Sequence, residues 1–347
     1  MKLVESLQGK AFKRPPLWIM RQAGRYLPEF RSLRQKVPQF LEFCAHPNLA
    51  AEVTLQPIER FNLDAAIIFS DILVVPHALG QKVHFAPEEG PVLEALSSEK
   101  DLDRLFPKIS QEHIEPTLEA LRLVRKELDP SKTLIGFAGA PWTVMTYMLE
   151  GGGSKGKGHL HSLSCYLENT PFFEALLERV IEATQIYLLE QVKAGAQVLK
   201  IFDSWASSVP FPLQEALVLT PLKRIAATLK ERHPEIPLIL FPKGLPHSFL
   251  ARFQKEISFD GLACDASEDP NLVAQTLGVS SCIQTGPNPA FLKVGGEFLE
   301  DEVKRYLDAF DGRPYIFNLA HGISKDTPPD NLKRMIDFID EYTDKRA

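Results

Sequence analysis

The chain has 347 residues and a net charge of −6, with 44% hydrophobic and 24% charged residues, an ordinary globular composition. The acidic balance argues against nucleic acid as a partner, and no apolar run reaches the roughly 18 residues that a membrane span requires. The first ten residues lack a signal-peptide pattern, so we expect a cytoplasmic protein, or an organellar one without its transit peptide.

Short apolar runs recur along the chain, and we predict eight β-strands from them. They cover residues 16–20, 64–69, 133–138, 197–202, 237–242, 259–263, 280–285 and 314–318. The runs are apolar almost throughout, which is typical of parallel strands buried on both faces. Helical patterns lie between most of them, for example at 116–128, 172–194, 221–232 and 331–342. This alternation predicts an α/β fold, a single-domain (β/α)8 TIM barrel over residues 1–347.

In such a barrel the active site lies at the carboxyl ends of the strands. The residues just past the predicted strands are Arg21, Ser70-Asp71, Gly139-Ala140-Pro141-Trp142, Asp203-Ser204-Trp205, Lys243-Gly244, Cys264-Asp265, Gly286-Pro287 and Ala320-His321-Gly322. Polar groups gather there although the preceding residues are apolar. We therefore predict the functional site at this face.

A cationic segment follows the first predicted strand. Residues 10–36 contain eight basic side chains against Glu29 alone, a net charge of +7, so the rest of the chain carries −13. This imbalance indicates a small anionic ligand. Arg21 and Arg25 share one face of a helical turn, and paired guanidinium groups suit carboxylates. The alternatives are a solvated charged face or a surface pair between Arg25 and Glu29.

Two further residues are candidates for chemistry. Asp71 lies between apolar runs, where a carboxylate requires partners. It is a candidate acid, base or acceptor of N–H bonds, and the alternative is a structural ion pair. His321 follows the last predicted strand, and a functional and a structural role are about equally consistent with that position.

Three other patterns predict no function. The four cysteines have no metal or redox spacing and are interpreted as buried apolar residues. Residues 151–158 match G-x-x-x-x-G-K, but Gly158 replaces the required Ser or Thr and the run follows a predicted helix. We interpret it as a loop over the pocket. His159 and His161 are too isolated to predict a zinc site.

Residues 15–31, PPLWIMRQAGRYLPEFR, closely resemble the N-terminal signature of the uroporphyrinogen decarboxylase family. Residues 136–154, 69–80, 201–206 and 318–323 also resemble family segments, so the likeness covers nearly the whole chain. It implies a homodimeric (β/α)8 barrel of haem and chlorophyll biosynthesis that uses no metal or cofactor. The implied reaction removes the four acetate carboxyl groups of uroporphyrinogen III, giving coproporphyrinogen III and four CO2.

The resemblance also assigns residues to the site. Those implied to bind substrate are Arg21, Gln22, Ala23, Gly24, Arg25, Arg34, Asp71, Tyr147, Ser204 and His321. Asp71 is expected to accept the pyrrole N–H groups and to stabilise the transition state. Arg21 is the second catalytic candidate, because either Arg21 acting through a water or a substrate carboxyl group could deliver the ring proton.

Two other function classes stay open. Corrinoid-linked methyltransferases of the same fold carry a His-x-Cys zinc site near the fifth strand, where this chain reads Pro242-Lys243-Gly244. A non-catalytic tetrapyrrole-binding protein would use the same arginines without a reaction. Asp71 argues against it, since an anion carrier does not need a carboxylate there.

Overall fold

The computed structural model describes residues 1–86, 90–153, 158–277 and 281–346. Its main sheet has seven parallel strands in the order β1-β4-β5-β6-β7-β8-β9. Their bounds are β1 (Ala65–Ile67), β4 (Thr133–Gly139), β5 (Val198–Asp203), β6 (Leu238–Pro242), β7 (Gly261–Ala263), β8 (Cys282–Thr285) and β9 (Tyr315–Phe317). Every residue of these strands is buried, which confirms seven of the eight predicted strands and the parallel α/β class.

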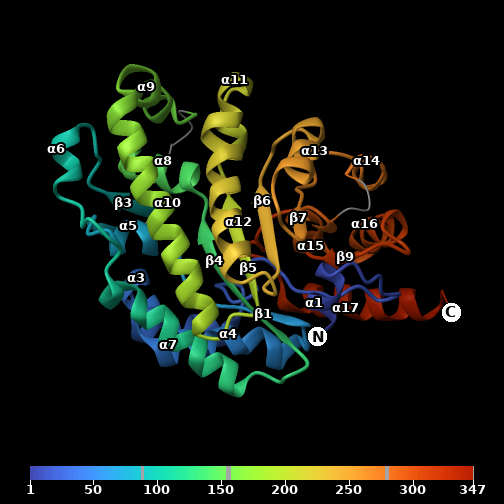
Figure 1. Cartoon of the computed structure of the whole chain (residues 1–347). Helices are drawn as coiled ribbons and strands as arrows, with labels where there is room; N and C mark the ends of the chain where they lie inside the picture. Colours follow the sequence, from blue (N-terminus) through green and yellow to red (C-terminus); the bar gives the residue numbers. More distant parts are fainter. Residues whose placement is uncertain (87–89, 154–157, 278–280, 347) are drawn as a thin grey trace.

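Helices cover the outer face of the curved sheet (Figure 1). In chain order they are α1 (Lys2–Leu7), α2 (Pro28–Lys36), α3 (Phe40–Cys44), α4 (Pro47–Phe61), α5 (Val74–Ala78), α6 (Glu99–Leu102), α7 (Gln111–Glu127), α8 (Pro141–Glu150), α9 (Leu160–Glu168), α10 (Thr170–Lys193), α11 (Phe211–Gln214), α12 (Thr220–Arg232), α13 (His247–Glu256), α14 (Pro270–Thr276), α15 (Pro289–Val294), α16 (Gly296–Ala309) and α17 (Pro329–Asp344). A 3-10 turn, η1 (Ala206–Ser208), and a π turn, η2 (Glu215–Leu219), follow β5.

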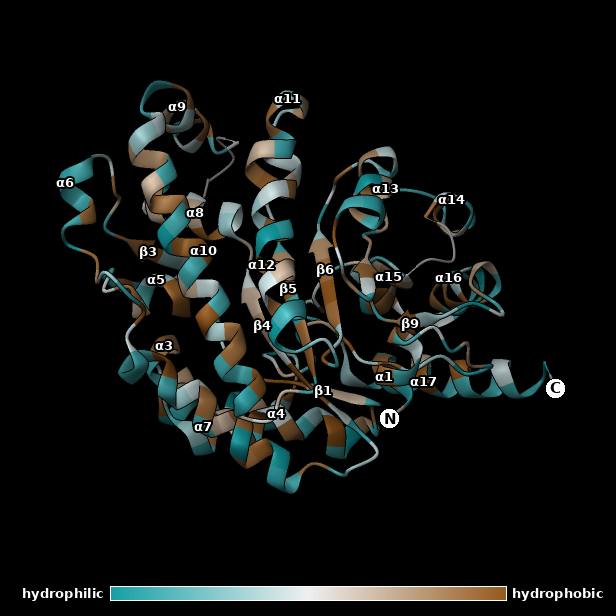
Figure 2. Ribbon diagram, viewed as in Figure 1, coloured by the Kyte–Doolittle hydropathy of each residue, from teal (hydrophilic) through white to brown (hydrophobic). Residues whose placement is uncertain are grey.

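The four example helices predicted from periodicity are confirmed as α7, α10, α12 and α17. Figure 2 shows apolar and polar residues alternating along α10 and α12 beside apolar strands such as β6. The start of α7 was predicted five residues late, at Pro116, because proline commonly opens a helix. The helix instead passes through Pro116. None of the helices in the described ranges is both long and apolar enough to cross a bilayer.

The predicted strand at 16–20 forms only one bridge, between Leu17 and Phe317 of β9. Phe317 N donates to Pro16 O at 3.0 Å, and Asp64 N donates to Leu17 O at 2.9 Å. The segment 16–18 thus lies between β9 and the start of β1. Prolines 15 and 16 have no N–H to donate, which explains why no longer ladder forms. The expected barrel is therefore confirmed in part, as a curved parallel sheet of seven strands.

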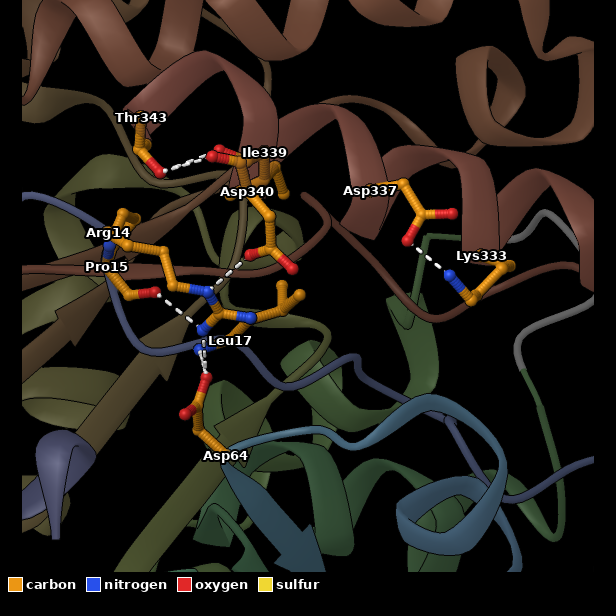
Figure 3. A network of polar contacts seen from close by, with 9 residues as sticks. All are labelled: Arg14, Pro15, Leu17, Asp64, Lys333, Asp337, Ile339, Asp340 and Thr343. Carbon is orange, nitrogen blue, oxygen red and sulfur yellow. Dashed lines mark hydrogen bonds and ion pairs between the residues drawn. The ribbon is translucent and has the colours of Figure 1, made fainter. Parts of the chain in front are cut away.

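A polar network holds this segment in place (Figure 3). The guanidinium of Arg14 contacts Asp64, before β1, and its Nε donates to Asp340 Oδ1 of α17 at 2.7 Å. Asp64 Oδ2 also accepts the N–H of Leu17 at 2.8 Å. A carboxylate that accepts both a guanidinium and a backbone amide gives charge-assisted bonds of fixed geometry. The network therefore sets where the following residues, Met20 onward, enter the sheet's carboxyl edge.

A small antiparallel hairpin, β2 (Val83–Ala86) with β3 (Gly90–Leu93), was not predicted. Its residues are mostly half-buried and show no clean alternation of polar and apolar side chains. Helices α8, α9 and α11 lie beyond the carboxyl ends of the central strands (Figure 1). These ends, together with the turn after Leu17, form the face on which the predicted site residues lie.

Candidate active site

Residues 21–25, called the arginine segment below, begin with a sharp turn shortly after the bridge between Leu17 and β9. Gln22 N donates to Ile19 O at 2.8 Å, and Arg21 adopts a φ of +64°, which is uncommon for a residue other than glycine. The buried side chain of Gln22 bonds at both ends: Oε1 accepts from Ile19 N, and Nε2 donates to Ala65 O of β1, each at 3.0 Å. Gln22 therefore anchors the turn, and any contact with a ligand falls to its backbone.

Arg21 and Arg25 are both exposed, and among the described residues neither forms an ion pair. Glu29 instead pairs with Arg60 at 3.2 Å, so the alternative pair between Arg25 and Glu29 does not form. Ala23 and Gly24 are half-buried between the two arginines. Two guanidinium groups without local acids are suited to a ligand that carries carboxylates.

Arg34 differs from these two arginines. Its Nη1 donates to Val37 O, and its guanidinium lies 5.7 Å from the ring of Phe40 and 5.6 Å from that of Phe43. Burial lowers the pKa of Arg34, and the nearby charge of Arg25 lowers it further. Arg34 thus stands beside Arg25, but local bonds and aromatic rings already engage it.

The arginine segment meets the loop after β9. The stem of the Arg21 side chain packs directly on Gly322, next to His321. Burial lowers the pKa of His321 to about 4, and the charges of Lys243 and Arg21 act in the same direction. The imidazole is therefore neutral at pH 7. Since Lys243 follows β6, three separate parts of the chain converge at this point.

Asp71 lies three residues beyond Ile68, in the turn that leads to α5. Its Oδ1 accepts the N–H of Leu73 at 2.8 Å. Burial raises the pKa of Asp71, while the Leu73 bond and the charge of Arg21 lower it. Within the described part of the chain Asp71 has no ion-pair partner inside 4 Å, so the structural ion pair considered above does not form.

Tyr147 and Ser204 come from the neighbouring β4 and β5 units. Tyr147 lies in α8 and is half-buried. Burial raises its pKa, the indole of Trp205 lowers it, and the charges of Asp71 and Arg21 also act on it. Tyr147, Asp71 and Arg21 therefore lie within electrostatic range of one another. Ser204 is half-buried directly after β5, beside Trp205.

Two charged residues of β5 were not among the predicted site residues. Asp203 is buried, accepts from Thr143 Oγ1 at 2.5 Å, and has its pKa raised to about 7 by burial. Lys200 is fully buried, and its Nζ lies 4.9 to 5.3 Å from the rings of Trp18, Phe202 and Phe241. Asp203 stands among the residues just past the predicted strands, but no role was assigned to it. The signal for Lys200 was a charge inside an apolar run, which a scan of strand ends passes over.

A surface hollow of about 630 Å³ lies away from this face, on α4 and α7. Its lining includes Glu29, Glu52, Glu59 and Glu127. Because these carboxylates repel an anion, the hollow does not suit the ligand that the arginine segment predicts.

Three patterns were predicted to have no function: the cysteines, the glycine run and the pair of histidines. All four cysteines are buried, as expected. The glycine run follows helix α8, so it lacks the strand that a phosphate-binding loop needs. Residues 154–157 lie outside the described residues, so the predicted loop over the pocket is not tested. Within the described ranges, no three His, Cys, Asp or Glu side chains are grouped to hold a metal ion.

Comparison with known proteins gives one consistent family. The profile of the uroporphyrinogen decarboxylase (URO-D) family matches residues 1–342. The uroporphyrinogen decarboxylase of Roseobacter denitrificans is 44% identical over 338 residues, which cover 97% of each chain. That of Rhodospirillum rubrum is 44% identical over 337 residues, covering 97% of this chain and 96% of the relative.

Solved structures show the same fold at greater distance. A methyltransferase from Methanosarcina mazei has a TM-score of 0.78 at 21% identity and covers 98% of both chains. A B12-independent methionine synthase from Shewanella sp. W3-18-1 has a TM-score of 0.56 at 12% identity, covering 96% of this chain and 97% of its own. At these identities the likeness concerns the fold alone.

Proposed function

Because the chain belongs to the uroporphyrinogen decarboxylase family, we propose that it converts uroporphyrinogen III into coproporphyrinogen III. The enzyme is a carboxy-lyase of porphyrin biosynthesis that removes the four acetate carboxyl groups as CO2. The observation that carries this assignment is the meeting of Arg21, Asp71 and His321 at one face. Cations for the carboxylates and a carboxylate for the pyrroles then face the same macrocycle.

The chemistry needs an electron sink, and enzymes often recruit a cofactor to supply it. A pyrrole supplies its own. Protonation of the ring carbon beside the acetate-bearing carbon gives a cationic ring. The bond between the acetate methylene and its carboxylate then breaks, its electron pair enters the ring, and CO2 leaves. Protonation of the resulting methylene carbon gives a methyl group, and loss of the ring proton restores the pyrrole.

Asp71 is the residue proposed to lower the barrier. Its carboxylate accepts the pyrrole N–H groups and offsets the positive charge that develops on the ring. An electrostatic contact of this kind contributes about 3–4 kcal/mol to the transition state. Burial alone favours the protonated acid, but N–H donors from the substrate favour the charged form. Substrate binding therefore helps to keep Asp71 ionised.

The other residues hold the substrate in place. Arg21 and Arg25 bind acetate and propionate carboxylates, and the turn from Gln22 to Gly24 supports them. Arg34 adds positive charge beside Arg25. Tyr147 and Ser204 donate hydrogen bonds to substrate carboxylates. His321, which is neutral at pH 7, donates one N–H to a carboxylate without adding charge.

The wider properties of the enzyme are part of the same proposal. Residues 1–347 form one (β/α)8 barrel domain, and the bonds of segment 16–18 to β9 and β1 support closure at that seam. The protein is a cytoplasmic homodimer that serves haem and chlorophyll synthesis and uses no metal or cofactor. Light scattering of the purified protein measures the oligomeric state, and a monomer at micromolar concentration contradicts the dimer.

The activity is tested by anaerobic incubation with uroporphyrinogen III, with and without a chelator, followed by chromatography of the oxidised products. We expect coproporphyrin III and four CO2 per substrate in both samples. Activity that disappears with the chelator would favour a zinc-dependent enzyme such as a corrinoid-linked methyltransferase. Tight binding without CO2 release would favour a tetrapyrrole-binding protein.

A further inference from the structure

Both polar groups of the Trp205 backbone, its N–H and its carbonyl, form hydrogen bonds. Its N–H donates to Thr143 Oγ1 at 3.1 Å, and its carbonyl accepts from Trp142 Nε1 at 3.1 Å and from Ser208 Oγ at 2.7 Å. Thr143 in turn donates to the buried Asp203. Two bonds from side chains of α8 and two from Ser208, whose backbone N–H also donates to the Trp205 carbonyl at 2.9 Å, thus hold the backbone from which the indole of Trp205 projects.

The indole N–H of Trp205 is itself buried and has no hydrogen-bond partner in the described part of the chain. A buried donor without an acceptor is unfavourable and needs an explanation. Tyr147 lies one helical turn beyond Thr143, on the face of α8 that bonds the Trp205 backbone, and the indole also lowers the pKa of its hydroxyl. Hydrogen bonds at active sites are often long without substrate and shorten in the complex. Tyr147 is therefore the acceptor that the geometry offers.

His159 supports the other side of this arrangement. It precedes α9, is only 2% exposed, and has a φ of +58°. Its ring lies 5.0 Å from that of Trp205, tilted by 54°, and neither ring nitrogen has a hydrogen-bond partner among the described residues. Residues other than glycine keep such a backbone where surrounding packing imposes it, often beside a functional site. Here the result is an aromatic ring pressed against Trp205.

We infer that Trp205, backed by His159, is a positioning residue that donates its indole N–H to the Tyr147 hydroxyl oxygen. The indole is a donor only, and a hydroxyl has one proton and two lone pairs. With one lone pair occupied, the Tyr147 proton points away from Trp205 and toward the site. A carboxylate can only accept, so this orientation suits a substrate carboxylate. The inference rests on the proposed function, because that function makes Tyr147 a substrate contact.

A double-mutant cycle tests the coupling directly. Tyr147→Phe is expected to raise the KM for uroporphyrinogen III about tenfold, as one lost bond to a charged group would. Trp205→Phe keeps a ring but removes the N–H, and it is expected to raise the KM several-fold in the native background. In the Tyr147→Phe background it is expected to add nothing. Equal effects in both backgrounds would overturn the inference, because a purely structural role predicts them.

Two matched variants separate orientation from general damage. His159→Ala removes the ring against Trp205 and is expected to behave like Trp205→Phe, whereas His159→Phe keeps a ring and stays near the native KM. Tyr166→Phe, on α9, is the control tyrosine. Trp205→Phe should act equally with and without it. Coupling of Trp205 to Tyr166 as strong as to Tyr147 would contradict the inference.

A readout without substrate keeps this inference separate from the proposed function. Loss of the indole N–H is expected to raise the pKa of Tyr147. This pKa is measured by tyrosine absorbance titration, as the difference between the Trp205→Phe variant and the double variant that carries Trp205→Phe and Tyr147→Phe. An unchanged titration of Tyr147 would contradict the contact even if the enzyme is active. If the native enzyme releases no CO2 but the titration shifts, the proposed function fails and the contact stands.

Discussion

The side chain of Arg21 lies so close to the α-carbon of Gly322 that only a hydrogen atom fits between them. A Cβ at Gly322 would come within 2.8 Å of Arg21 Cγ and 2.9 Å of its Nε, and closer still to Cδ. Gly322 therefore sets the path of the Arg21 stem. It also joins the arginine segment to His321, from the other end of the chain.

Gly322→Ala tests this contact. The added methyl group is expected to push the flexible Arg21 side chain aside, raising the KM for uroporphyrinogen III by about tenfold or more while the melting temperature changes little. Kinetics and a thermal melt measure the two effects. Gly312→Ala is the control, since Gly312 has a φ of +69° and open space around it. It should lower stability and leave the KM unchanged. A native KM in Gly322→Ala would refute the contact's role.

The left-handed backbone of Arg21 gives a second prediction. Arg21→Gly and Arg21→Ala both remove the guanidinium and are expected to lose turnover equally. Because φ is +64°, glycine is favoured there over alanine by about 1 kcal/mol, so Arg21→Gly should be the more stable variant. Urea unfolding of the pair measures the difference. Equal stability would show that the backbone relaxes when the side chain is lost.

Asp71→Asn is expected to reduce kcat by a factor of about 10² to 10³, equivalent to roughly 3–4 kcal/mol. The fold should persist, since the asparagine oxygen can still accept the Leu73 N–H and the side chain loses a buried charge. Circular dichroism and single-turnover CO2 release measure the two properties. Asp129→Asn, at an exposed turn, is the control and should retain native turnover. Native turnover in Asp71→Asn would remove the assigned role.

Burial of His321 predicts how stability depends on pH. Its pKa is about 4 in the folded protein and near 6.5 when unfolded, so between these values the unfolded chain binds more protons. Stability contributed by this group is therefore complete above pH 6.5 and falls as the pH drops toward 4. His321→Gln should flatten that part of the profile, measured by urea unfolding from pH 4 to 7. The same slope in both proteins would show that other groups cause it.

Lys200 predicts the same direction of pH dependence in a higher pH range. Burial holds the pKa of Lys200 well below 10.5 in the folded state. Between that lowered value and 10.5, the unfolded chain therefore binds a proton that the folded chain does not. Stability is thus reduced at neutral pH and rises as the pH approaches 10.5. Lys200→Met, of similar shape, is expected to stabilise the protein by about 1–4 kcal/mol at pH 7, with a smaller gain at pH 10.

Lys132→Met is the matched control for this change. Lys132 is half-buried, and its Nζ donates to Asn62 Oδ1 and Leu63 O at 2.7 Å each. Its replacement should destabilise the protein, because it leaves a carbonyl without its donor. A loss of stability in Lys200→Met as well would mean that the cage of Trp18, Phe202 and Phe241 holds a charged amine after all.

The local pattern of apolar residues predicted the strands and helices whose surroundings are uniform along their whole length. The buried strands read as continuous apolar runs, and the long helices read as periodic ones. The segment at 16–20 failed as a strand because its prolines remove donors and Gln22 caps its end, which is a matter of hydrogen bonds and not of hydropathy. The hairpin β2–β3 was missed because half-buried strands lack a clear alternation.

The candidate site divides in the same way. Arg21, Asp71 and His321 became candidates because each stands shortly after a predicted strand, and topology alone gathers such residues. The pairing of Asp203 with Thr143 was not predicted. This contact joins side chains from different βα units, and nothing in either local sequence states the distance between them.

The contact of Arg14 with Asp64 and Asp340 also constrains the order in which the chain is assembled. The part of the chain that contains Arg14 and the arginine segment leaves the ribosome early. Its ion-pair partner Asp340 lies in α17, which is synthesised almost last. Until then the edges of β1 and β9 lack their covering segment, and such unpaired edges invite association with other chains. A nascent chain therefore passes most of its synthesis without the Asp340 partner of Arg14, and the network that positions the chain before Arg21 is complete only with the final helix.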